Sequence, residues 1–93
     1  MAIEFEVVYQ LEVTGEDIPR IAETWRDKIK LAIEEKLTTH PDVYGKPLRR
    51  SFRSYRKLRV GDYRVVFRIE AIQVKIFAIA HRSVVYKIMA HRL

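Results

Sequence analysis

Two runs of alternating polar and apolar residues flank the dipeptide Gly61-Asp62, and this arrangement constrains the fold more than any other feature of the sequence. Alternation places successive side chains on opposite faces of a β-strand. A two-residue connection that contains glycine is typical of an antiparallel hairpin. A third run with strand-forming residues follows the second. Three consecutive strands are therefore predicted, over residues 53–60, 63–70 and 73–80.

The first half of the chain changes from a strand pattern to a helix pattern. Residues 3–9 form a β-branched and aromatic run that predicts a first strand. From Ile18, apolar residues recur every three or four positions, which predicts an amphipathic helical hairpin with a short first arm, ending before Pro41. Trp25 lies on the apolar stripe and is predicted to belong to the core. A last helix is expected after Ser83, which is suited to its N-cap.

The predicted order is β-α-α-β-β-β-α in a single domain of residues 1–93. We expect an α+β fold with a small mixed, mainly antiparallel sheet and with helices packed on one face, because each element must bury its apolar side. The place of the first strand in the sheet stays open. The chain has no cysteine, which excludes disulfides and a thiolate zinc site. No apolar run is long enough to span a membrane, no secretory signal is evident, and a cytoplasmic location is expected.

Charge is distributed unevenly along the chain. Residues 1–45 carry five Lys and Arg against ten Asp and Glu, whereas residues 46–68 carry nine against one. Like charges concentrated in a folded hairpin destabilise it unless an anionic partner is present. The distribution indicates a polyanion such as nucleic acid as the partner, with a solvated basic face as the alternative.

Alternation predicts that Lys57, Arg59 and Arg64 project from neighbouring strands onto one surface, the one that the helices leave uncovered. The end of the last strand should bring His81 and Arg82 to the rim of that surface, with Tyr86 close to Arg82. Phosphates favour such charge, and unstacked bases favour aromatic rings. Three loop cations extend this surface: Arg49, Arg50 and Arg53.

Several of these residues have a structural alternative. Tyr55 and Tyr63 are expected to pack within the sheet, and Arg68 to pair with Glu70 or a helix acid. His81 is either a structural hydrogen-bonding residue or a catalytic one. The other histidines belong to no constellation that indicates a metal site, and no cofactor is expected.

Three pieces of sequence, "GKPLRR", "YRKLRVGDYRVVF" and "HRSVVY", resemble the RelE/ParE toxin superfamily on its RelE side, in the order and at the separation typical of that family. The resemblance implies the toxin of a type II toxin–antitoxin pair that cuts mRNA in the ribosomal A site. It also implies a cognate antitoxin, RelB-like or another small acidic or amphipathic protein, and contact with operator DNA only through the antitoxin complex. It assigns functional positions to Lys57, Arg64 and Tyr86, with Arg82 near another. The resemblance also singles out His81, because a histidine is frequent there in the family and a histidine near the C-terminus takes part in catalysis in some related toxins. Arg56 is a further candidate for RNA binding, because some members of the family carry a basic residue there.

The chemistry expected from the residues is attack of an RNA 2′-OH on the adjacent phosphorus. Residues 46–82 contain two acids, Asp62 in a turn and Glu70 at a strand end, and neither is placed for acid–base work. We expect Arg64 and Arg82 to stabilise the phosphorane, and Lys57 or Tyr86 to handle the proton of the 2′-OH. The alternatives are a gyrase inhibitor of the ParE type, a nucleic-acid-binding module without catalysis, and a degenerate toxin that keeps only its antitoxin contact.

Overall fold

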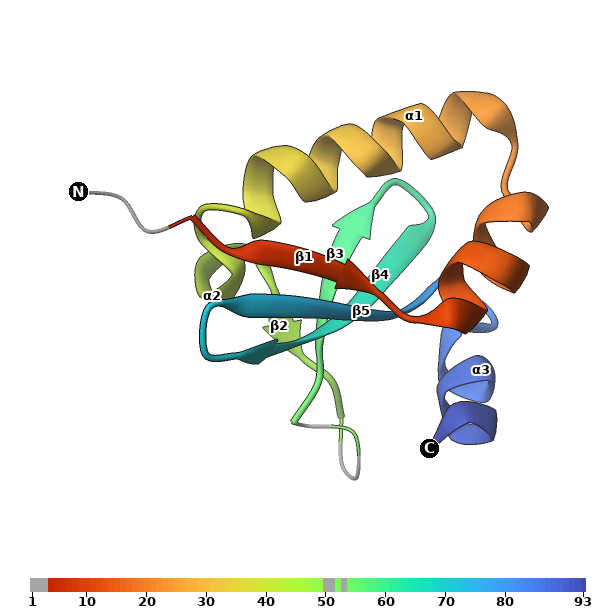
Figure 1. Cartoon of the computed structure of the whole chain (residues 1–93). Helices are drawn as coiled ribbons and strands as arrows, with labels where there is room; N and C mark the ends of the chain where they lie inside the picture. The colour runs from red at the N-terminus through yellow and green to blue at the C-terminus, as the bar shows by residue number, and fades with distance from the viewer. Residues whose placement is uncertain (1–3, 50–51, 53) are drawn as a thin grey trace.

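The sheet has five strands in the order β1-β5-β4-β3-β2, and β1 is parallel to β5 while every other pair is antiparallel (Figure 1). The computed structural model describes residues 4–49, 52 and 54–93. The predicted mixed, mainly antiparallel sheet is confirmed. The first strand, whose position the sequence left open, lies at one edge of the sheet, beside β5. The strands are β1 (Glu6–Tyr9), β2 (Lys46–Pro47), β3 (Arg56–Val60), β4 (Tyr63–Glu70) and β5 (Gln73–His81).

The hairpin at the centre of the sheet forms around the predicted two-residue turn. Gly61 has a φ of +59°, a left-handed conformation that glycine adopts without a Cβ clash. The indole of Trp25 packs against this glycine, because a Cβ built there would lie 2.4 Å from the ring. Trp25 also packs at 5.4 Å, centroid to centroid, against Tyr63. Its predicted role in the core is confirmed.

The helical region begins earlier than predicted and is interrupted once. Short helical segments η1 (Val13–Asp17) and η2 (Ile18–Arg20) form the first arm, and α1 (Glu23–Ala32) continues into η3 (Ile33–Leu37). A four-residue helix, α2 (Pro41–Tyr44), follows η3. The last helix, α3, spans Val85–Arg92. The prediction that Ser83 caps it is wrong, because Val84 occupies the N-cap position and Ser83 bonds to His81 instead.

The helices lie on both faces of the sheet, not on one as expected (Figure 1). The segments from η1 to η3 cover a core that includes Leu58, Val65 and Phe67. On the opposite face, Val85 and Met89 of α3 pack on a second core. A β-bulge between Val66 and Phe67 adds an extra residue to β5, so that Phe77 and Ala78 both face α3. The bulge thereby adds the Phe77 side chain to the apolar surface of the second face.

A buried ion pair joins the first helical arm to the C-terminal helix. Asp17, only 2% exposed, accepts hydrogen bonds from Arg92 Nη1 and Nη2 at 2.8 and 2.7 Å and from the Ile79 backbone N–H at 2.9 Å. Arg92 Nη1 also donates to the Phe77 carbonyl at 2.8 Å. These bonds fix the end of α3 against β5, and α3 carries Tyr86. Across the described residues, no helix is long and apolar enough to cross a bilayer.

Candidate active site

Two adjoining hollows open on the face of the sheet that carries α3. The first hollow has a volume of about 430 Å³ and the second about 260 Å³. Lys57 and Arg64 line both, so the two hollows share a cationic wall. The remaining residues of the first hollow are His81, Arg82, Ser83, Val85 and Tyr86. Those of the second hollow are Tyr44, Lys46 and Arg59.

The strand register places these cations together. Arg59 lies directly opposite Arg64, and Lys57 is two residues before Arg59, so all three share one face. The shared surface predicted for them is confirmed. This surface is not free of helices as expected, because α3 covers the part of the same face around Val66. The helix therefore walls the site instead of leaving an open sheet.

The turn of the hairpin and the end of β5 hold two arginines at the rim. Arg64 Nη1 donates to the carbonyls of Gly61 and Tyr63, both at 2.9 Å. Arg82 Nε lies 3.6 Å from an oxygen of Asp62, and its backbone N–H donates to the Asp62 carbonyl at 2.8 Å. Burial, followed by the charges of Arg59 and Arg82, lowers the pKa of Arg64. The local field is therefore strongly positive, which favours an anion.

Tyr86 brings a phenol to the first hollow and lies beside two cations. Its Oη is buried and has no hydrogen-bond partner among the described residues. The Arg49 guanidinium lies 4.7 Å and the Lys57 ammonium 5.8 Å from the centre of its ring. Burial acts to raise the pKa of the phenol, but Arg49 and Lys57 outweigh it and lower the pKa below its ordinary value of 10. These cations favour the phenolate, the form that accepts a proton.

His81 has a fixed tautomer in this conformation. The backbone N–H of Ser83 donates to its Nδ1 at 3.1 Å, and the Ser83 hydroxyl lies 2.8 Å from the same nitrogen. Because a backbone N–H can only donate, Nδ1 is an acceptor and the ring proton is on Nε2. His81 therefore offers a hydrogen-bond donor to the first hollow.

The other predicted site residues are distributed over the molecule. Arg49 lies over Tyr86, and Arg59 lines the second hollow. Arg56 points to the other face by alternation, and its Nη1 donates to the carbonyls of Gly45 and Asp42 at 2.9 and 3.3 Å. Arg50 and Arg53 lie outside the described residues.

Two residues for which a purely structural role was expected, Arg68 and Tyr55, do have one. Arg68 pairs with Glu70 through Nη2 at 2.5 Å and Nε at 2.8 Å, as the sequence suggested. Tyr55 is buried and packs edge-on against Phe77 at 5.1 Å. Sequence reasoning missed Tyr44 and Lys46 as lining residues. Their signal was an aromatic and a cation on either side of a glycine, immediately before an edge strand.

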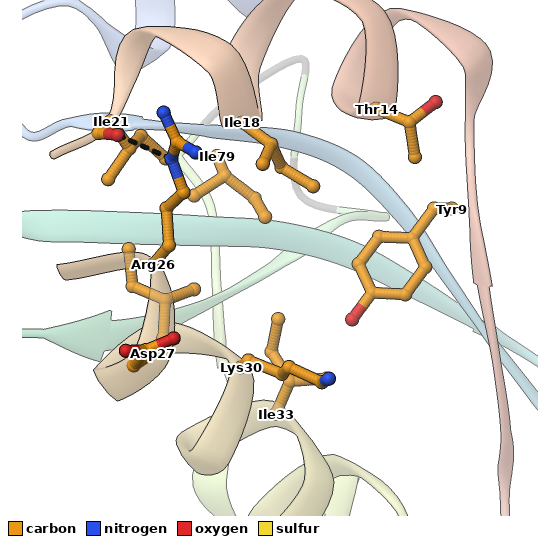
Figure 2. Close-up of a pocket in the computed structure, with 10 residues that line it drawn as sticks. Tyr9, Thr14, Ile18, Ile21, Arg26, Asp27, Lys30, Ile33 and Ile79 are labelled. Carbon is orange, nitrogen blue, oxygen red and sulfur yellow. Dashed lines mark hydrogen bonds between the residues drawn. The ribbon is translucent and has the colours of Figure 1, made fainter. Parts of the chain in front are cut away.

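A third pocket, apolar and of about 270 Å³, lies on the opposite face, between the helical arms and β1 (Figure 2). Isoleucine side chains form much of its wall, and Arg26 at its edge donates from Nε to the Ile21 carbonyl at 2.6 Å. Burial, with a smaller contribution from Glu34, raises the pKa of the Tyr9 phenol there, so this tyrosine stays protonated. The charged residues of this pocket have both signs (Arg26, Asp27 and Lys30), whereas those of the first hollow are the cations Lys57, Arg64 and Arg82. The first hollow is therefore the candidate active site for an anionic substrate.

Comparison with known protein families identifies the chain as a toxin of the type II toxin–antitoxin systems. Residues 7–86 match the model of the ParE toxin of the type II system parDE, and the chain belongs to this family. The resemblance to the RelE/ParE superfamily is thereby confirmed. No curated protein sequence matches the chain.

Solved structures share the fold over most of the chain. The toxin–antitoxin complex RelBE2 from Mycobacterium tuberculosis matches with a TM-score of 0.79 and 24% identity, covering 87% of this chain and 94% of that one. The RelB–RelE complex from Methanococcus jannaschii matches with a TM-score of 0.65 and 20% identity, covering 86% and 95%. YafQ from E. coli matches with a TM-score of 0.59 and 16% identity, covering 89% and 99%.

Proposed function

We propose that this toxin is a ribosome-dependent mRNA endonuclease that acts in the A site and whose active site is the first hollow. The observation that carries the proposal is the Tyr86 phenol, which has a buried Oη, a lowered pKa and two neighbouring cations. A phenol whose pKa is lowered by neighbouring cations is suited to proton transfer. The remaining groups of the first hollow suit a phosphate.

The reaction proposed is internal transfer of the phosphodiester. Tyr86, as phenolate, takes the proton of the 2′-OH while the 2′-oxygen bonds to phosphorus. Arg64 and Arg82 stabilise the charge that develops on the phosphorane, and the Nε2–H of His81 donates to a non-bridging oxygen. The bond from phosphorus to the 5′-oxygen breaks, and the Lys57 ammonium gives this oxygen its proton. The products are a 2′,3′-cyclic phosphate and a free 5′-hydroxyl.

The proton balance closes within the site. After one turnover Tyr86 is neutral and Lys57 is an amine, and transfer of one proton between these neighbours restores the starting pair.

The hollow is shallow and lies at the surface, so it orients a flexible RNA strand poorly by itself. Holding the 2′-oxygen in line with the leaving oxygen accounts for a large part of the catalysis of such reactions. The ribosome holds mRNA in a fixed conformation and would supply this orientation. Activity is therefore expected on ribosomes and not on free RNA.

Inhibition of DNA gyrase is the second candidate function, and the match to the ParE toxin family favours it. On this alternative the basic hollows bind the partner without chemistry, and the Tyr86 hydroxyl has no catalytic role. A non-catalytic nucleic-acid-binding module would likewise not need that hydroxyl.

The partner proposed for neutralisation is a cognate antitoxin. Two of the similar structures are complexes of a toxin with its antitoxin. An acidic or amphipathic segment of the antitoxin would cover the hollows, because Lys57 and Arg64 are complementary to carboxylates. Contact with operator DNA would arise only through that complex.

The test compares Tyr86→Phe with wild type in a purified translation reaction, with mRNA cleavage as the readout. The substitution removes one buried hydroxyl and keeps the ring, and a loss of at least about 100-fold in cleavage rate is expected for an acid–base group. Tyr9→Phe is the matched control, because it removes a phenol oxygen at the apolar pocket on the other face. Full cleavage by a folded Tyr86→Phe protein refutes the assignment. Absence of cleavage by wild type, together with trapped DNA–gyrase complexes, establishes the second candidate instead.

A further inference from the structure

The second hollow contains like charges that the fold does not neutralise. Lys46 of β2 lies directly opposite Lys57 of β3, and Arg59 lies directly opposite Arg64 of β4. Like charges in directly opposed cross-strand positions destabilise a sheet. Within the described residues, Lys46, Lys57 and Arg59 form no ion pair with a carboxylate. A bound anion would therefore stabilise this part of the sheet, because it would offset the repulsion within both pairs.

The junction that carries Tyr44 and Lys46 is fixed in place. Between them lies Gly45, which is buried, and a Cβ built on it would lie 2.2 Å from Cζ of Phe67 and 2.9 Å from the Pro41 carbonyl oxygen. The Gly45 carbonyl accepts a hydrogen bond from Arg56 Nη1 at 2.9 Å. The chain therefore passes from α2 to β2 in close contact with the core, and Tyr44 and Lys46 are positioned before any ligand arrives.

The Tyr44 side chain reaches solvent at the rim of the second hollow. The residue is 46% exposed although it lies beside the buried Pro41 and Gly45. The Lys36 ammonium lies 5.5 Å from the ring centre. An exposed aromatic ring among unpaired cations is the arrangement by which proteins bind single-stranded nucleic acid.

We propose that the second hollow binds the nucleotide next to the scissile phosphate of single-stranded RNA. Lys46 and Arg59 hold its phosphate, and its base stacks on Tyr44. The proposal rests on the proposed function of the first hollow, because Lys57 and Arg64 line both hollows and therefore lie between the two neighbouring phosphates. Tyr44, Lys46 and Arg59 take no part in proton transfer. They determine how tightly and in which register the strand binds.

The experiment uses two short RNAs that cannot be cut, because a 2′-deoxy sugar replaces the ribose at the cleavage position. One RNA carries the fluorescent base 2-aminopurine on the 5′ side of this sugar, and the other carries it on the 3′ side. Affinity is measured as a function of salt for wild type, Lys46→Met and Lys30→Met. Lys30 lies on α1 at the opposite face and controls for the loss of one positive charge. We expect Lys46→Met to reduce the slope of log affinity against log salt by about 0.7, and Lys30→Met to leave it unchanged.

Tyr44 variants test the stacking separately. We expect Tyr44→Ala to weaken binding by about tenfold and to remove the quenching of 2-aminopurine in one of the two oligonucleotides. Tyr44→Phe, which keeps the ring, should preserve both. Thermal unfolding of each variant shows that the fold is intact.

The outcomes separate this proposal from the function on which it rests. Wild type that cuts mRNA on ribosomes, with Lys46→Met and Tyr44→Ala binding RNA as tightly as Lys30→Met, overturns the nucleotide site alone. Wild type that binds these RNAs through Tyr44 and Lys46 but does not cut mRNA on ribosomes supports nucleotide binding by the second hollow and overturns the nuclease. Absence of RNA binding at low salt overturns the nucleotide site whatever the cleavage assay gives.

Discussion

The buried ion pair between Asp17 and Arg92 gives the sharpest test of how this fold holds its C-terminal helix, and Asp17→Asn is the change that tests it. The side chain of Asp17 is 1% exposed and that of Arg92 is 13% exposed. The carboxylate accepts three hydrogen bonds, two from Arg92 and one from the backbone of Ile79. Asparagine has nearly the same volume, but it loses the charge and turns an amide NH₂ toward groups that also donate.

The expected cost follows from the partners that remain. Breaking a buried ion pair by removing one partner costs about 3–5 kcal/mol, because the other charge stays buried without compensation. Arg92 still donates to the Phe77 carbonyl at 2.8 Å and lies 3.7 Å from Glu16. These partners place the cost near the lower limit, at about 3 kcal/mol. For a domain of this length that lowers Tm by roughly 12–24 °C, out of a total stability of about 5–15 kcal/mol.

Urea unfolding, followed by far-UV circular dichroism, measures this loss. Glu16→Gln is the control, because Glu16 is 54% exposed and contacts Arg92 only at 3.7 Å, so its removal should cost less than about 1 kcal/mol. The double variant Asp17→Leu with Arg92→Met should be more stable than Asp17→Asn, since it leaves no buried charge. A loss below about 1 kcal/mol for Asp17→Asn would refute the reasoning.

Two further predictions concern the hairpin turn and the phenol. Gly61→Ala should destabilise the protein by about 1–2 kcal/mol from backbone strain alone at φ +59°, with more from the displaced Trp25 ring. Gly15→Ala is the control and should be neutral or stabilising, because a Cβ there meets nothing within 4 Å. Equal effects of the two substitutions in urea unfolding would contradict the packing of Trp25 on Gly61. The Tyr86 phenol should titrate below 10 in wild type, and mRNA cleavage should increase with pH up to the pKa of this phenol. Arg49→Met should raise the pKa of Tyr86, because a cation that stabilises the phenolate is lost. Ultraviolet or ¹³C NMR titration measures this pKa, and an unchanged value in Arg49→Met would disprove the role of Arg49.

The strands of the hairpin were predictable because their signal is local. Residues 63–70 were predicted as a strand and form β4 with the same bounds, since alternation and a glycine turn act over a few positions. The edge position of β1, parallel to β5, was not predictable because pairing between residues more than sixty positions apart leaves no pattern in either segment. The β-bulge beside Phe67, in the sheet against which α3 packs, also has no signature in the sequence.

The candidate site shows the same division. Alternation along two adjacent strands correctly placed Lys57, Arg59 and Arg64 on one surface. It gave no indication that Arg56, the neighbour of Lys57, would instead bind the carbonyl of Gly45. The membership of Tyr44 and Lys46 in the second hollow follows from pairing between β2 and β3, and that pairing is a property of the folded sheet.

The order of residues by itself determined the elements, the apolar faces and the charge of the central hairpin, because period and composition act between neighbours along the chain. Tertiary structure alone decided which charges are neutralised and which stay available. Burial and long-range pairing placed Arg92 against Asp17 and the Tyr86 hydroxyl where no described group bonds to it. Proton affinity and ion pairing depend on distances between atoms in space, and only the packed chain sets those distances.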